Sequence, residues 1–87
     1  MKIREGFLLR NVAGNNVVVP IGQATLDFNG MMSLNETGAF IFSKMLDGTT
    51  KEQLIEDLIG EYEVEREIAE KDVEDFINKV EGEGLLE

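Results

Sequence analysis

The sequence predicts an α+β domain in which a small antiparallel sheet is followed by three helices. Extended, β-branched segments occupy the first third of the 87 residues, and a helical period of apolar side chains runs through the remainder. Strands followed by a run of helices are typical of α+β folds rather than of doubly wound parallel sheets. At this length we expect one domain, residues 1–87, with a small core that needs no metal or disulfide.

The first two strands are predicted as a hairpin. The mostly apolar segment Phe7–Val12 and the β-branched run Val17–Val19, which ends at Pro20-Ile21, flank the turn sequence Ala-Gly-Asn-Asn at residues 13–16. Pro20 has no N–H to donate to a ladder, so we expect it at the end of its strand or on an unpaired edge.

The third strand is predicted at residues 31–34. An Asn-Gly turn signal at residues 29–30 precedes it, and a second tight hairpin that pairs residues 24–28 with this segment is the alternative. Neighbouring strand residues point to opposite faces, so Met31 and Met32 cannot both enter the core. One is then available for an adaptable contact surface, or is merely half-buried.

The first helix is predicted to begin after Asn35, a favourable N-cap, and to end at Asp47-Gly48. Glu36 places a negative charge in its first turn. Gly38 lies inside this helix, where glycine costs about 1 kcal/mol relative to alanine. Tight packing of the helix on the sheet explains it best, and close approach of another backbone is the alternative.

Two more helices follow. The second is predicted to begin with a capping box, either Thr49 with Glu52 or Thr50 with Gln53, and to end near residues 60–62. The third spans residues 65–81 and is ended by glycines, after which the last apolar pair, Leu85-Leu86, can fold back on the core. Three helices with tight turns beside a small sheet match a winged helix-turn-helix.

The composition argues against catalysis. Cysteine and histidine are both absent, which removes thiolate metal sites, disulfides and every Ser-His or Cys-His arrangement. No glycine-rich phosphate motif occurs. The densest carboxylate cluster lies on the third predicted helix. We interpret it as a solvated acidic helix face, and the alternative interpretation is a surface that attracts a basic peptide or protein. The members of this cluster are Glu67, Glu70, Asp72, Glu74 and Asp75.

Charge also limits the partners. The net charge is −10, and residues 47–87 hold fifteen acidic against four basic residues, whereas residues 1–46 have a balance of +1. An acidic third helix would be repelled by DNA phosphates, so nucleic acid is an improbable partner. No apolar run approaches the ~18 residues of a membrane span, and no signal peptide is apparent, so we expect a cytoplasmic protein that does not bind membranes.

Several segments resemble the PqqD family of small peptide-binding chaperones, also called RiPP recognition elements, which serve ribosomally made, post-translationally modified peptides. The resemblance covers nearly the whole chain and is most specific over residues 34–86. The position of Phe42 is often Trp in that family, which alters packing volume. The matching segments are Leu34-Asn35-Glu36-Thr37-Gly38-Ala39, Ile41-Phe42, Asp72-Val73, Phe76 and Gly84-Leu85-Leu86.

This resemblance implies a winged helix-turn-helix domain that binds the leader segment of a precursor peptide. The leader would add as a strand in a groove between the third strand and the third helix, and would be presented to a modifying enzyme, commonly a radical S-adenosylmethionine enzyme. The chain itself would hold no cofactor and would be a monomer or weak homodimer. Carried onto this sequence, the implied groove residues are Gly30, Met31, Met32, Ser33, Leu34, Asp72, Val73, Phe76, Ile77 and Lys79.

The residues themselves are compatible with this function. A small sheet has an open edge that accepts another strand unless it is covered. The competing hypothesis is a winged-helix docking or dimerisation module with no leader peptide. A small enzyme would need a metal site built from carboxylates alone.

Overall fold

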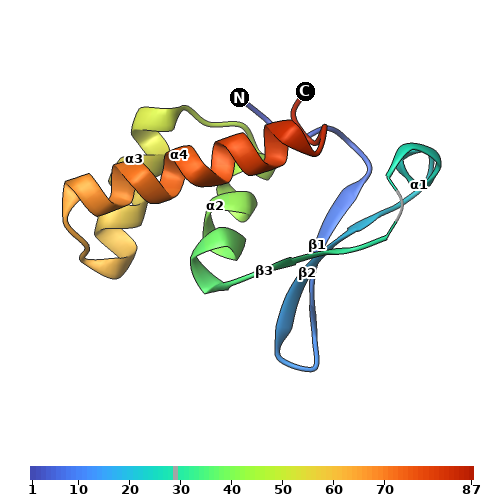
Figure 1. Cartoon of the computed structure of the whole chain (residues 1–87), viewed down its shortest axis with the longest axis horizontal. Helices are drawn as coiled ribbons and strands as arrows, with labels where there is room; N and C mark the ends of the chain where they lie inside the picture. Colours follow the sequence, from blue (N-terminus) through green and yellow to red (C-terminus); the bar gives the residue numbers. More distant parts are fainter. Residues whose placement is uncertain (29) are drawn as a thin grey trace.

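A computed structural model describes residues 1–28 and 30–87 of the chain. A hairpin and a third strand form the sheet, a one-turn helix interrupts the path between them, and the longer helices follow (Figure 1). The elements are β1 (Phe7–Val12), β2 (Asn15–Pro20), α1 (Ala24–Asp27), β3 (Met32–Leu34), α2 (Glu36–Leu46), α3 (Lys51–Tyr62) and α4 (Arg66–Gly82).

The sheet has the order β1-β2-β3 and both pairings are antiparallel. The predicted hairpin is confirmed, with its turn formed by Ala13 and Gly14, which have φ values of 54° and 85°. Positive φ at both central residues suits a tight turn between twisted strands. In the part of the chain that is described, β3 pairs only with β2, so its other edge is open to a further strand.

The alternative strand at residues 24–28 is wrong, because Ala24–Asp27 forms helix α1. Ala24 is buried, and a Cβ added to Gly6 would lie only 2.8 Å from the Cβ of Ala24. Helix α1 is therefore packed against the segment that leads into β1. The third strand begins at Met32 rather than Met31. The predicted Asn-Gly turn falls on Asn29, outside the described residues.

The three longer helices form where the apolar period predicted them. The Asn35 side chain accepts a hydrogen bond from Gly38 N at 2.7 Å, which caps α2. Of the two proposed caps for α3, Thr50 is correct, with Gln53 N donating to its hydroxyl at 3.1 Å. The Gln53 side chain donates a hydrogen bond to Asp57 and not to the backbone of Thr50, so only one of the two hydrogen bonds of a capping box is formed.

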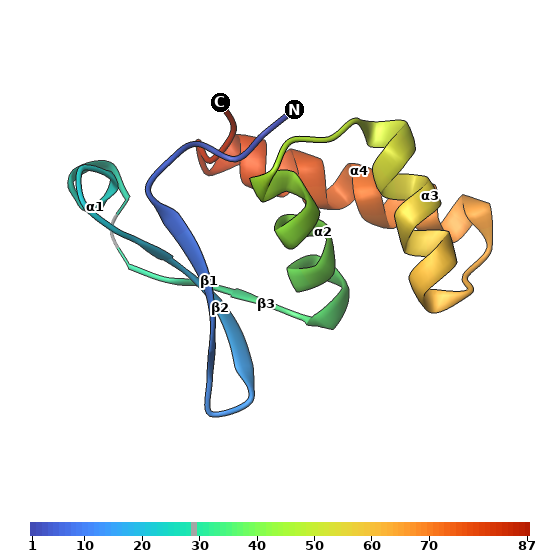
Figure 2. The ribbon, with the colours of Figure 1, turned by 180° about the vertical axis from the view of Figure 1, so that it is seen from behind.

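Helices α2, α3 and α4 pack together on one side of the molecule, whereas α1 lies at the far end of the sheet and the tip of the β1–β2 hairpin projects away from the helices (Figures 1 and 2). The two ends of the chain lie side by side, where Ile3 bridges to Leu86 and Arg4 N donates to Leu85 O at 2.8 Å. Leu85 is fully buried, which confirms that the last apolar pair folds back on the core. No helix in the described residues is long and apolar enough to cross a membrane.

Candidate functional site

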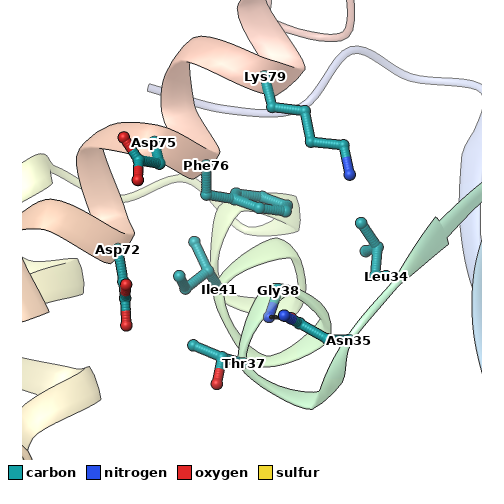
Figure 3. A pocket seen from close by; sticks show the side chains of 9 residues that line it. All are labelled: Leu34, Asn35, Thr37, Gly38, Ile41, Asp72, Asp75, Phe76 and Lys79. Carbon is teal, nitrogen blue, oxygen red and sulfur yellow. Dashed lines mark hydrogen bonds between the residues drawn. The ribbon is translucent and has the colours of Figure 1, made fainter.

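A cavity of about 320 Å³ opens between α4 and the junction of β3 with α2 (Figure 3). The junction is short because Asn35 both ends the strand and caps the helix. This places the first turn of α2 opposite the middle of α4. The lining residues are Leu34, Asn35, Thr37, Gly38, Ile41, Asp72, Asp75, Phe76 and Lys79.

The floor of this cavity is apolar. Leu34, Ile41 and Phe76 come from three different elements, and each is at most 9% exposed. Gly38 allows α2 and α4 to approach, since a Cβ there would lie 3.3 Å from the Phe76 ring and 3.6 Å from Leu34 Cβ. Tight packing thus explains Gly38 as predicted, although its nearest side-chain carbon belongs to α4 rather than to the sheet.

Charged side chains of α4 form one wall. Asp72, Asp75 and Lys79 project from the helix on either side of Phe76 in Figure 3. Lys71 Nζ lies 2.8 Å from Asp75 Oδ2, and the hydrogen bond to Asp75 is the main cause of a raised pKa of Lys71. Because Lys71 pairs with Asp75, the wall presents the carboxylate of Asp72 and the ammonium of Lys79 above an apolar floor.

A second cavity, of about 360 Å³, lies at the other end of β3. It is lined by Met31 and Met32 and by Glu83, which follows the last residue of α4. Met32, at the start of β3, shares the second cavity with Glu83, and Leu34, at the end of β3, shares the first cavity with residues 72–79 of α4. The two cavities therefore lie along one groove, the β3–α4 groove. Its second-cavity residues are Asp27, Phe28, Met31, Met32 and Glu83.

The structure brings together most of the residues that the resemblance implied for the groove. Those that line one of the cavities are Met31, Met32, Leu34, Asp72, Phe76 and Lys79. Gly30, Ser33 and Ile77 line neither cavity. Val73 is 0% exposed and belongs to the core, so its assignment to the groove surface is corrected. A helix face that points at α2 and α3 cannot also contact a peptide.

Part of the site was not predicted from the sequence. Asp75 follows Asp72 by three residues, and Glu83 follows Lys79 by four, so both lie on the same helix face as the predicted groove residues of α4. Helical periodicity could therefore have identified them. The α2 contribution could not be found in that way, because it depends on how α2 crosses α4. The missed residues are Asn35, Thr37, Gly38, Ile41 and Asp75 in the first cavity and Asp27, Phe28 and Glu83 in the second.

The β3–α4 groove holds apolar and charged side chains from β3, α2 and α4. Among the described residues, no group of three or more potential ligands is placed to hold a metal ion. Its features are an open strand edge beside it, an apolar floor and a charged wall, which suit the binding of an extended peptide.

Comparison with known proteins agrees with this geometry. The sequence pattern of the family described as coenzyme PQQ synthesis protein D (PqqD) matches residues 17–86. The chain belongs to the PqqD family. The match begins within β2 and includes α1, β3 and α2 to α4, and therefore both sides of the β3–α4 groove.

Solved structures similar to this PqqD-family chain confirm the predicted winged helix-turn-helix fold. One, described as TbiB1 in complex with the TbiA(beta) leader peptide, is 25% identical with a TM-score of 0.78 and covers 100% of this chain and 95% of its own. Another, a lasso peptide synthetase B1 complexed with the leader peptide, is 26% identical with a TM-score of 0.73, with coverages of 97% and 93%. No curated protein matched by sequence.

Proposed function

We propose that this PqqD-family protein is a peptide chaperone that binds the leader segment of a ribosomally made precursor peptide and presents it to a modifying enzyme. The observation that carries the proposal is the β3–α4 groove beside an open strand edge, in a fold shared with proteins solved in complex with leader peptides. In this role the whole chain acts as one binding domain, with no catalytic residue and no cofactor of its own.

The leader is proposed to add as a strand along Met32–Leu34. Backbone hydrogen bonds to the open edge would provide affinity without regard to sequence, and alternate side chains of the leader would enter the groove. The groove contacts are Met31, Met32 and Leu34 on the strand side and Asp72, Phe76 and Lys79 on α4, with Thr37 at the start of α2. Gly30 and Ser33 would contribute backbone groups near this edge.

The partner enzyme is proposed to be of the radical S-adenosylmethionine type, and the chain to act as a monomer or weak homodimer. The acidic α4 would favour basic groups on the leader or on the enzyme. Co-purification with the modifying enzyme encoded nearby, and sedimentation of the chain alone, test these two points separately.

The central test is an amide NMR titration of the isotopically labelled chain with the leader of a short precursor encoded beside its gene. Shift changes concentrated at residues 31–34 and on α4 are expected. Thr37→Arg fills the mouth of the first cavity and should abolish binding, whereas Ser43→Arg, on the exposed face of the same helix, should not. Unchanged spectra with several such leaders would instead favour a docking module without a peptide ligand.

A further inference from the structure

Opposite charges are placed at fixed positions along the α4 wall of the groove. Asp72 and Lys79 both line the first cavity, and Phe76 lies between them on the same face of the helix. Seven residues separate the two charged side chains, which is two helical turns or about 10 Å. The wall therefore has a negative end and a positive end on either side of the apolar floor.

These two charges are available to a ligand. Within residues 1–28 and 30–87, neither Asp72 nor Lys79 forms an ion pair, whereas Asp75 is held by Lys71 at 2.8 Å. Asp72 is half-buried and Lys79 is exposed, with its ammonium extended across the cavity toward Leu34 in Figure 3. A peptide in the first cavity would meet Asp72 at one end and Lys79 at the other.

We propose that the groove selects peptides in which an apolar side chain is flanked by a basic residue facing Asp72 and an acidic residue facing Lys79. The inference rests on the proposed function and specifies its substrate class. The apolar side chain contacts Leu34, Ile41 and Phe76, which form the floor. The two flanking charges then fix which way the peptide lies along the wall.

The spacing within the peptide follows from strand geometry. Residues of a strand advance about 3.3 Å each, and alternate side chains share one face. If the apolar residue occupies the floor, the nearest groove-facing positions are two residues before and two residues after it, about 13 Å apart. Extended Lys, Arg, Glu or Asp side chains bridge the small difference from the ~10 Å separation on α4.

The test is selection from a displayed library of short peptides that have a central apolar residue and randomised residues on both sides. The full chain is used as bait, in its natural form and as the exchange variant Asp72→Lys with Lys79→Asp, which keeps the net charge at −10. The natural chain is expected to enrich one order of opposite charges, and the exchange variant the reverse order. Synthetic peptides of the two orders should differ about tenfold in affinity at low salt, and less at high salt.

The matched control is the exchange Lys2→Glu with Glu63→Lys. Both positions are exposed, neither lines a groove cavity, and the net charge is again unchanged. This control should keep the natural charge order. If the double exchange on α4 fails to fold, Asp72→Asn and Lys79→Met are each expected to reduce the tenfold ratio.

The outcomes separate this inference from the proposed function. Selected peptides that are blocked by Thr37→Arg but show no charge order, or the same order with the exchange variant, would overturn the charge selection and leave groove binding intact. If no selected peptide is blocked by Thr37→Arg, the groove is not the binding site and both proposals fail.

Discussion

Gly38 on α2 and Phe76 on α4 lie so close that a Cβ added to the glycine would come within 3.3 Å of Cε1 of the ring. The same Cβ would lie 3.1 Å from Oδ1 of Asn35, the atom that caps α2. The missing side chain therefore sets how near α2 comes to α4, and with it the shape of the groove floor.

Gly38→Ala is expected to leave the free energy of unfolding within about 1 kcal/mol of the natural chain, because improved helix propensity offsets the displacement of the ring. Leader affinity should fall, since the added methyl shifts Phe76. Gly60→Ala on α3 is the control, because its added Cβ meets nothing within 4 Å. It should raise stability in urea unfolding and leave calorimetric affinity unchanged. Equal affinity in both variants would show that the leader does not reach this floor.

Val73→Asp is expected to unfold the chain rather than to block the groove selectively. The side chain is 0% exposed, and burying an unpaired carboxylate costs free energy comparable with the ~5 kcal/mol total stability of a small domain. Circular dichroism should show loss of helix. Asn78→Asp, exposed on the same helix, should retain the spectrum. A folded Val73→Asp protein would contradict the assignment of this residue to the core.

The adjacent methionines should respond differently to truncation. Met31 is 69% exposed and Met32 is 8% exposed. Met32→Ala should therefore lower the free energy of unfolding by about 2–5 kcal/mol, the range for buried large-to-small changes. Met31→Ala should change stability little and weaken leader binding. Thermal unfolding and peptide titration of both variants provide the measurement, and a reversal of the two effects would contradict the position of β3.

Removal of the Arg66 side chain is expected to loosen the contact between α3 and α4. Its guanidinium pairs with Glu52 and Glu56 of α3, at 2.8 and 2.7 Å, and with Glu70 of α4 at 3.3 Å. Arg66→Met leaves these carboxylates to repel one another, so Tm should fall at low salt and recover partly at high salt. Lys71→Met, which removes one exposed pair, should have a smaller effect. A salt-independent loss would indicate packing rather than charge.

Tyr62 should titrate above its ordinary pKa of 10.0. Burial is the main cause of the raised pKa, followed by the negative charges of Glu36 and Glu61. Because the folded chain then holds this proton more tightly than the unfolded chain, stability should fall as pH rises above 10 toward the folded-state pKa.

Tyr62 is the only tyrosine in a chain without tryptophan, so ultraviolet absorbance of the phenolate reports its pKa directly. Glu36→Gln is expected to lower the pKa in part. A pKa at or below 10 in the natural chain would contradict the half-buried position of the ring against Phe40.

Local signals in the sequence determined the hairpin, the longer helices and their caps. The turn at residues 13–14 and the caps Asn35 and Thr50 each depend on side chains and backbone angles within a few residues. The apolar period of residues 65–81 likewise marked the buried face of α4, whereas the residues expected at the groove came from the resemblance to the PqqD family. Helix α1 was missed because a single turn is too short for a period to show.

Tertiary structure alone decided which residues face the groove. Val73 and Phe76 are three positions apart on the same helix, yet one is enclosed in the core and the other forms the groove floor. That division depends on the crossing of α2 under α4, which Gly38 permits. Periodicity fixes the angular position of each side chain around its own helix, but the neighbours that cover it come from segments distant in the sequence.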